Sequence, residues 1–249
     1  RVKASTRLKM TEMLFRDDPY LRSSEGTVTH ISDDGGVVFD KTIFYPNSGG
    51  QAGDSGEITF SDGNKCLINT TRKTENGNIL LVPEVDSKLP SVGDACWQKI
   101  NWKKRYRHMR MHTALHLLSV VIPLPVTGGQ ITSEKGRLDF DMPDAPEDKQ
   151  SIEDELNKLI SGDYLITMSW ISDDELLKNS NLVKTMSVKP PMGTGKVRLI
   201  RIGNDERQID LQPCGGTHVN RTLEIGRMTV GKIEKKGKQN RRVSILFPS

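Results

Sequence analysis

Residues 110–118 read Arg-Met-His-Thr-Ala-Leu-His-Leu-Leu, and this stretch decides how the second half of the chain is expected to fold. Apolar residues around it recur at steps of three and four, which predicts a half-buried helix over residues 102–121 that ends before Pro123. His112 and His116 are four residues apart, so they lie one turn apart on the same face of that helix. Two imidazoles in this arrangement can reach a common metal ion.

A second pair of metal-binding side chains follows about a hundred residues later, in the stretch 212–218, Gln-Pro-Cys-Gly-Gly-Thr-His. Cys214 supplies a thiolate and His218 a third imidazole. The chain has only five histidines and three cysteines, so two closely spaced pairs predict one shared site. One thiolate and three imidazoles without clustered carboxylates suit Zn²⁺ better than Mg²⁺ or Ca²⁺.

The ligand set leaves two alternatives open. His108 lies one turn before His112, but the direction of side chains drifts by about 40° every four residues, so we prefer His112 with His116 over His108 with His112. The four candidates either close the site, or His218 stands off and leaves a position for water or substrate, which is the arrangement we prefer. Asp139, Asp141 and Asp210 are unranked candidates for supporting the ligands.

Three motifs, in this order, resemble the editing domain of alanyl-tRNA synthetases, which threonyl-tRNA synthetases share, and the free-standing AlaX-type alanyl-tRNA editing proteins. They are the histidine pair, the Cys214–His218 stretch and an earlier segment, 40–56, that contains Phe-Tyr-Pro and Gly-Gly-Gln. Ser48 stands in that segment where free-standing members often carry glycine, as it also does in many synthetases, so it bears only on the subtype.

The resemblance implies an α+β chain with a small N-terminal glycine-rich β-barrel domain over residues 1–98. An α/β sandwich follows over residues 99–249 as a zinc-dependent aminoacyl-tRNA editing domain. The residue patterns agree with this division. Strands are expected at 26–32, 36–40, 56–61, 65–71 and 79–85, with a last barrel strand after residue 94. The second part is expected to contain a hairpin at 130–141, a helix at 151–160 capped by Ser151, strands at 164–171, 197–202 and 209–211, a helix at 173–178 and a hairpin at 227–247.

The resemblance also implies a function: hydrolysis of the ester that links serine, or glycine, to tRNA(Ala). An alanine-binding pocket cannot strongly reject these amino acids, because methylene-sized differences are worth only about 1–3 kcal/mol. The metal ligands and catalytic centre would be His112, His116, Cys214 and His218. The substrate-binding residues would be Thr42, Ser48, Gly49, Gly50, Gln51, Gly215, Gly216 and Thr217. The tRNA-binding residues would be Lys235, Lys236, Lys238 and Arg241.

Specific residues argue against other classes of function. Thr113 follows the first histidine where zinc proteases carry their glutamate base. The segment 48–51 lacks the Gly-Lys-Ser/Thr ending of a phosphate-binding loop, so no nucleotide triphosphate is expected. Two alternatives remain, a non-catalytic tRNA-binding module with a structural zinc and an editing fragment of an alanyl-tRNA synthetase.

Composition adds modest limits. The net charge of +4 does not by itself indicate a nucleic-acid partner, and 27% charged residues are ordinary for a globular protein. The longest apolar run is far shorter than the roughly 18 residues of a membrane span, so we expect a cytoplasmic protein without a membrane partner. Cys66 and Cys96 are expected to be buried thiols rather than a disulfide. The oligomeric state is left open.

Overall fold

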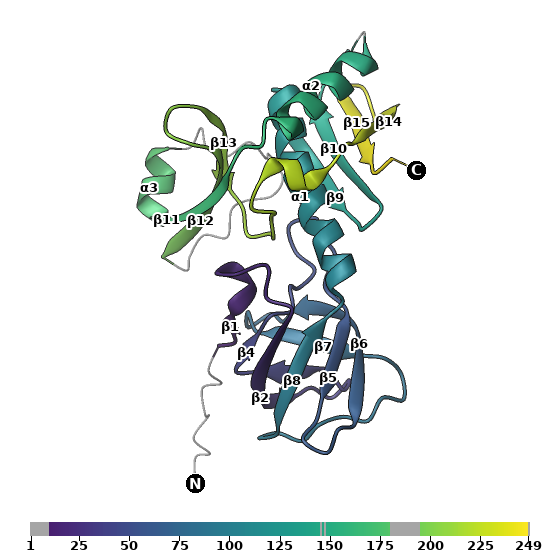
Figure 1. The fold of residues 1–249 in the computed structure, drawn as a ribbon, viewed down its shortest axis with the longest axis vertical. Helices are drawn as coiled ribbons and strands as arrows, with labels where there is room; N and C mark the ends of the chain where they lie inside the picture. The colour runs from purple at the N-terminus through teal and green to yellow at the C-terminus, as the bar shows by residue number, and fades with distance from the viewer. Residues whose placement is uncertain (1–9, 145, 147, 180–194, 249) are drawn as a thin grey trace. The chain divides into compact units, whose positions relative to one another are not determined.

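The computed structural model describes residues 10–144, 146, 148–179 and 195–248 (Figure 1). The chain divides into two compact units. The first comprises Arg1–Ser48 with Gly53–Arg105, and the second comprises Gly49–Ala52 with Tyr106–Ser249. The chain enters the second unit for Gly49–Ala52, returns to the first, and passes to the second unit again within helix α1 (Trp102–Val121). The division into functional domains at residues 98 and 99 stays a prediction.

The first unit is a closed six-stranded barrel in the order β2-β3-β7-β6-β5-β8, as the strand pattern predicts. Each pair of neighbouring strands is antiparallel. The strands are β2 (Ser23–Ile31), β3 (Val37–Phe39), β5 (Gly56–Thr59), β6 (Lys65–Lys73), β7 (Ile79–Pro83) and β8 (Ala95–Ile100). A short parallel pair, β1 (Glu12–Met13) with β4 (Lys41–Thr42), and the 3-10 turn η1 (Leu14–Arg16) were not predicted.

Buried and exposed side chains alternate along the strands, and the buried ones fill the barrel. In β8 the residues Cys96, Gln98 and Ile100 are buried while their neighbours are exposed, as expected of a strand with one face in the core. Cys66 and Cys96 are buried and free, which confirms the prediction that they do not pair. Burial raises the pKa of the Cys66 thiol, and burial raises that of Cys96 to about 11.

The second unit contains most of α1 and a four-stranded antiparallel sheet in the order β14-β15-β10-β9. Its strands are β9 (Val126–Ile131), β10 (Lys135–Asp141), β14 (Thr229–Lys235) and β15 (Asn240–Leu246). α1 packs closely on β10, because a Cβ added at Gly136 would lie 2.7 Å from the Met111 sulfur. Helix α2 (Lys149–Ser161) covers β14, where Glu153 accepts a hydrogen bond of 2.8 Å from the Val230 N–H.

The helix cap predicted at Ser151 is wrong. α2 begins two residues earlier, and the Asp148 carboxylate accepts from the Gln150 N–H at 2.8 Å. Ser151 therefore lies within the first turn and not before it, where a cap must stand. Helix α3 (Asp173–Lys178) agrees with the prediction, and Ser172 and Glu175 form its capping box.

A separate three-stranded antiparallel sheet, β11-β12-β13, completes the second unit. Its strands are β11 (Ile166–Ser172), β12 (Lys196–Gly203) and β13 (Gln208–Pro213), followed by the 3-10 turn η3 (Thr222–Ile225). Of the breaker-rich loop 189–196, whose role as a lid or a simple connection the sequence left open, residues 189–194 lie outside the described part. Across the described residues, none of the helices has the length and hydropathy of a membrane span.

Candidate metal centre

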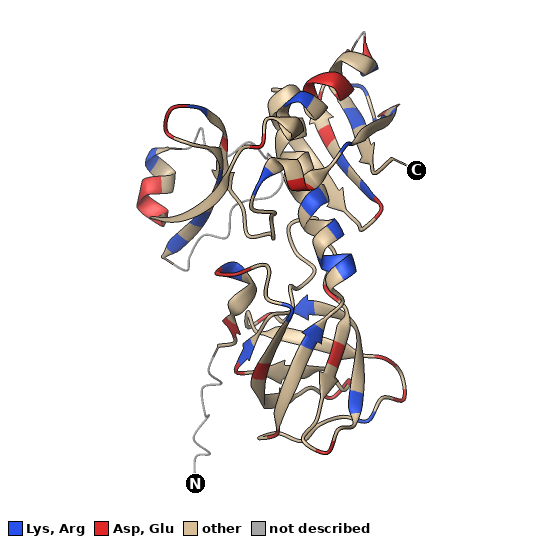
Figure 2. Ribbon diagram, viewed as in Figure 1, with Lys and Arg blue, Asp and Glu red and all other residues tan. Residues whose placement is uncertain are grey.

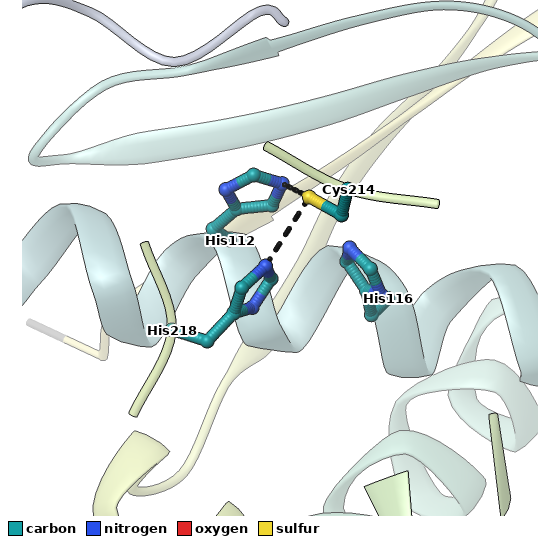
Figure 3. Close-up of side chains that lie close together, drawn as sticks. All are labelled: His112, His116, Cys214 and His218. Atoms are coloured by element: carbon teal, nitrogen blue, oxygen red, sulfur yellow. Dashed lines mark hydrogen bonds between the residues drawn. The ribbon is translucent and has the colours of Figure 1, made fainter. Parts of the chain in front are cut away.

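α1 and the loop after β13 bring four metal-binding side chains to one place (Figure 3). His112 and His116 project from α1 with ring centroids 5.3 Å apart. His218 lies with its ring centroid 4.3 Å from that of His112 and 4.6 Å from that of His116. Cys214 completes the cluster, so the two sequence pairs converge as predicted. The three imidazoles are buried, and the thiol is partly buried.

The donor atoms are close enough together to share one metal ion. All four donor atoms lie within 4.8 Å of one another. The Cys214 Sγ is 3.5 Å from His112 Nε2 and 3.3 Å from His218 Nε2. Zinc bonds of about 2.0 Å to nitrogen and about 2.3 Å to sulfur in a tetrahedron place these atoms about 3.5 Å apart. His218 is thus as close to the thiol as His112 is. This spacing does not support the expectation that His218 stands off from the other three donors.

Each imidazole is oriented by a hydrogen bond at its other nitrogen. His112 Nδ1 lies 2.9 Å from Gln51 Oε1, and His116 Nδ1 lies 3.0 Å from Asp210 Oδ2. His218 Nδ1 lies 3.1 Å from the Thr113 hydroxyl, which donates its own proton to the Met109 carbonyl and so accepts from the ring. Three acceptors fix the proton on Nδ1 and leave the Nε2 lone pairs free for a metal ion.

The Asp210 carboxylate has a second partner. The Gln212 side-chain amide donates to it at 2.7 Å and also lies 3.0 Å from His116 Nδ1. Because the His116 Nδ1 carries a proton and donates it to Asp210, the Gln212 amide can donate to the carboxylate but not to the ring. Asp210 and Gln212 are alternate residues of β13, so both side chains point to the same face of the strand and toward His116.

The electrostatics of the cluster suit metal binding. Burial opposes charge on the Cys214 thiol, but the nearby His112 and His218 lower its pKa well below the usual value. Burial and the charge of His112 lower the pKa of His218 to about 3. Burial also opposes charge on His116, yet its contacts with Asp210 and Cys214 raise its pKa to about 9. The thiolate of Cys214 and the neutral imidazole of His218 are in the protonation state that metal ligands require, whereas His116 must release a proton when a metal ion binds.

Gln51 is delivered by the segment 49–52, which runs alongside β9. The Ile131 N–H donates to the Gly50 carbonyl at 2.7 Å, and Gln51 forms a parallel bridge with Ile131. Gly50 has a φ of +82°, and a Cβ there would lie 2.9 Å from the Gly129 carbonyl oxygen, so only glycine fits. Gln51 is fully buried: its Oε1 also accepts from the Thr217 N–H at 3.2 Å, and its Nε2 donates to the Thr217 hydroxyl at 2.9 Å.

Comparison with known proteins assigns the chain to a family. The family model "Threonyl and Alanyl tRNA synthetase second additional domain" matches residues 197–244, and the model "tRNA synthetases class II (A)" matches residues 17–104. The alanyl-tRNA editing protein AlaX-M of Methanosarcina barkeri is 35% identical over 94% of this chain and 98% of its own length. The AlaX-M of Saccharolobus solfataricus is 33% identical with the same coverage. This chain belongs to the AlaX family of alanyl-tRNA editing proteins.

Longer relatives contain the same region. The AlaX-L of Pyrococcus horikoshii is 32% identical over 94% of this chain and 57% of its own length. The alanine–tRNA ligase of Pyrobaculum neutrophilum is 30% identical over 92% of this chain and 26% of its own length. The resemblance predicted from three motifs is therefore confirmed.

Two glycines of this AlaX family member have different surroundings. A Cβ at Gly216 would lie 2.1 Å from the His112 ring, so the backbone passes directly over that ligand. The Gly216 N–H points to the Cys214 sulfur at 3.4 Å. Gly215 has no atom within 4 Å of an added Cβ, so open space adjoins it. The structure thus places Gly216 against the metal ligands and leaves Gly215 accessible.

Arg198 of β12 supports the ligand loop and was not predicted. Its Nη1 donates to the Gly216 carbonyl at 2.8 Å and to the Cys214 carbonyl at 3.2 Å. The side chain is only 5% exposed. No local motif signals this role, because the partners are 16 and 18 residues away and meet Arg198 only through the pairing of β12 with β13.

Other predicted site residues lie elsewhere. Thr42 and Ser48 belong to the first unit, where the fully buried Thr42 hydroxyl donates to Gln98 and the Ser48 carbonyl accepts from the Tyr45 hydroxyl at 3.1 Å. Gly49 has no atom within 4 Å of an added Cβ. Their roles in substrate binding stay predictions.

The predicted tRNA contacts cluster at the turn between β14 and β15 (Figure 2). Lys235, Lys236 and Lys238 are exposed there, and Lys236 makes a long ion pair of 3.8 Å with Glu234. Arg241 differs from them, because it is only 9% exposed and its Nη2 donates to the Pro143 carbonyl at 2.6 Å. Its guanidinium is occupied by the protein's own backbone.

Proposed function

We propose that the protein hydrolyses the ester between tRNA(Ala) and wrongly attached serine, and also glycine, and that it acts in trans with zinc bound by His112, His116, Cys214 and His218. The family membership supports the class of reaction. The observation that carries the zinc dependence is the orientation of all three imidazoles by Gln51, Asp210 and Thr113, which leaves four donors facing one point. A cytoplasmic location, where charged tRNA is used, is part of the proposal.

The roles of the residues follow from their contacts. A zinc ion bound here supplies Lewis acidity, which polarises an ester carbonyl or lowers the pKa of a water molecule. Cys214 acts as a ligand and not as a nucleophile, because its sulfur lies among the three imidazoles. The open space beside Gly215 is where we place the aminoacyl ester. Gly49 and the predicted residues Thr42 and Ser48 complete the proposed substrate set. Gln51 and Gly216 contribute through His112, which both contact, and Gly50 and Thr217 contribute by holding Gln51 in place.

The tRNA body is proposed to contact Lys235, Lys236 and Lys238 at the β14–β15 turn. Exposed lysines attract phosphates. The more phosphates they neutralise, the more steeply the affinity for tRNA should fall as the salt concentration rises. Arg241 is left out of this surface because its guanidinium is buried against backbone carbonyls.

Deacylation of charged tRNA tests the proposal. The zinc-loaded protein should release serine and glycine from tRNA(Ala) much faster than it releases alanine. His116→Ala should abolish the reaction, whereas His30→Ala should not, because His30 is an exposed histidine of the barrel strand β2. Equal inertness toward all three charged tRNAs, with zinc bound, would overturn the assignment.

A second candidate is favoured by the closeness of four protein donors, since four protein ligands are typical of structural zinc. In that case the protein is a non-catalytic tRNA-binding module. His116→Ala would then unfold the second unit, and charged tRNA would bind without being hydrolysed. X-ray absorption of the zinc protein separates the two: an oxygen ligand beside the protein donors supports the hydrolase, and four protein ligands without an oxygen ligand support the structural site.

A further inference from the structure

One face of the three-stranded sheet faces the metal centre. Asp210 and Gln212 of β13 point from it toward His116, and Cys214 continues the same alternation. Cys214 also continues the register, because its N–H donates to the Arg198 carbonyl at 3.0 Å. The side chains opposite these residues on β12 and β11 therefore share the face that bears the metal ligand.

Two rows of side chains cross this face from β13 to β11. In one row Cys214 lies opposite Arg198, and Arg198 lies opposite Trp170. In the next row Gln212 lies opposite Ile200, and Ile200 lies opposite Met168. Neighbouring strands are about 4.8 Å apart, so Trp170 lies roughly 10 Å from Cys214, and Met168 lies roughly 10 Å from Gln212.

Exposure changes sharply along these rows. Arg198 and Ile200 are 5% and 1% exposed, whereas Trp170 and Met168 are 41% and 40% exposed. Trp170 is the only tryptophan in the second unit. A flat aromatic ring beside a flexible thioether, open on one side, is a surface that suits a planar apolar ligand.

Charges of both signs lie next to this surface. α3 begins directly after β11 with Asp173, Asp174 and Glu175, which appear as red segments in Figure 2. These carboxylates repel phosphates. Lys178 of α3 and Lys196, which is paired with Ser172, are exposed there as well, so the patch has no continuous basic surface for an RNA backbone, and a single terminal nucleoside needs none.

We propose that Trp170 and Met168 form the subsite for the adenine base of the 3′-terminal nucleoside of the charged tRNA. The inference rests on the proposed function, because the aminoacyl ester is carried by the ribose of that nucleoside. With the ester at the metal centre, the base lies one sugar away, and the two rows of the sheet lead from the ligand Cys214 to the ring of Trp170. Stacking of the base on the ring anchors the substrate without reading the amino acid.

Binding of hydrolysis-resistant analogues tests the subsite. The probe is 3′-seryl-amido-3′-deoxyadenosine, and its partner compound carries hydrogen in place of the base. Trp170→Ala should weaken binding of the first compound by about tenfold, within the range of base stacking on an aromatic ring, and leave the second unchanged. Trp170→Phe should retain most of the affinity. The matched control is Trp97→Ala, which removes an exposed tryptophan of β8 in the barrel and should change neither.

Fluorescence gives a second measurement that does not depend on the alanine variant folding. The adenine analogue should quench tryptophan emission of the unaltered protein and fail to do so in Trp170→Phe. Equal binding of both compounds by Trp170→Ala, or quenching that persists in Trp170→Phe, would overturn the subsite even if deacylation is observed. A change in sedimentation with unchanged analogue binding would overturn it as well and identify the patch as a contact between copies. If charged tRNA is not deacylated but the base-dependent binding is found, the subsite stands and the hydrolase assignment fails.

Discussion

Helix α1 contributes to two buried polar clusters of opposite character. In the first unit the Arg105 guanidinium donates from Nε to Asp54 Oδ2 at 2.9 Å, from Nη1 to the Pro19 carbonyl at 2.9 Å and from Nη2 to the Ile43 carbonyl. Arg105 and Asp54 are 0% and 1% exposed. In the second unit His112, His116, His218 and Cys214 turn four acceptor atoms toward one another. One cluster pairs every donor with an acceptor, and the other gathers four potential metal ligands.

The difference separates a structural cluster from a binding site. Around Arg105 the charges cancel, and the network needs nothing more. Lone pairs that face each other in a buried site repel until a cation joins them, so such a cluster costs stability when it is empty and is favoured only by what it binds. Burial and polarity alone do not distinguish the two; the direction of the donors does.

The largest expected effect comes from breaking the first cluster. Arg105→Ala leaves the Asp54 carboxylate buried without its charge partner, which should lower the free energy of unfolding by about 3–5 kcal/mol. Urea unfolding measures this loss. The control Arg72→Ala removes the ion pair with Asp34, which is exposed and screened by solvent, and should cost far less. Similar losses for the two variants would mean that the buried network contributes no more to stability than an exposed ion pair does.

The next effect tests whether the second cluster is built for metal. Asp210→Ala removes the carboxylate that orients His116, and zinc affinity should fall by about 10- to 100-fold. Competition with a chromophoric chelator measures the affinity. Asp139→Ala is the matched control, because Asp139 contacts Arg137 and Arg242 and none of the ligands. An unchanged affinity in Asp210→Ala would show that the contact with His116 is incidental.

A smaller effect is expected at Gln51. Gln51→Ala removes a neutral acceptor from His112, and zinc affinity should fall by about tenfold, at the lower end of the range for such supporting contacts. Gln130→Ala, on β9, is the control and should leave the affinity unchanged. A raised KM for charged tRNA with unchanged zinc affinity would instead support the role that the sequence predicts for Gln51, direct contact with the substrate.

The metal ligands could be predicted because their signals are local. A spacing of four residues on a helix, and again between Cys214 and His218, depends only on neighbouring positions and on the chemistry of thiol and imidazole. The barrel strands and α1 were predictable for the same reason, since alternation and three-to-four periodicity are local patterns. Even Asp210 could be proposed as a supporting residue, although not ranked above Asp139.

The supporting contacts were not predictable in this way. Gln51 meets Thr217 across 166 residues of sequence, and Thr113 meets His218 across 105. Such contacts depend on how β9, β13 and α1 assemble, and no short pattern records that. A glutamine in a glycine-rich segment is compatible with substrate binding and with ligand support alike; only the fold shows its amide turned to His112 and Thr217. The role of Arg198 was missed for the same reason, because its partners are backbone carbonyls that only the fold brings close to it.

The smallest effect compares the same side chain in the two environments. Cys214 is held toward thiolate by its histidines, while burial, together with Asp94 and Cys66, raises the pKa of the Cys96 thiol to about 11 from an ordinary value of 9.0. A thiol whose pKa is higher in the folded than in the unfolded protein contributes stability that is complete below about pH 9 and is lost as the pH rises toward about 11. Between about pH 8 and pH 10 this loss should be about 1 kcal/mol. Urea unfolding at the two pH values measures it, with Cys96→Val as the variant that removes the titrating group and keeps the volume. The unaltered protein should lose about 1 kcal/mol more than Cys96→Val; an equal loss would mean that the barrel does not hold this thiol neutral, and the contrast with Cys214 would weaken accordingly.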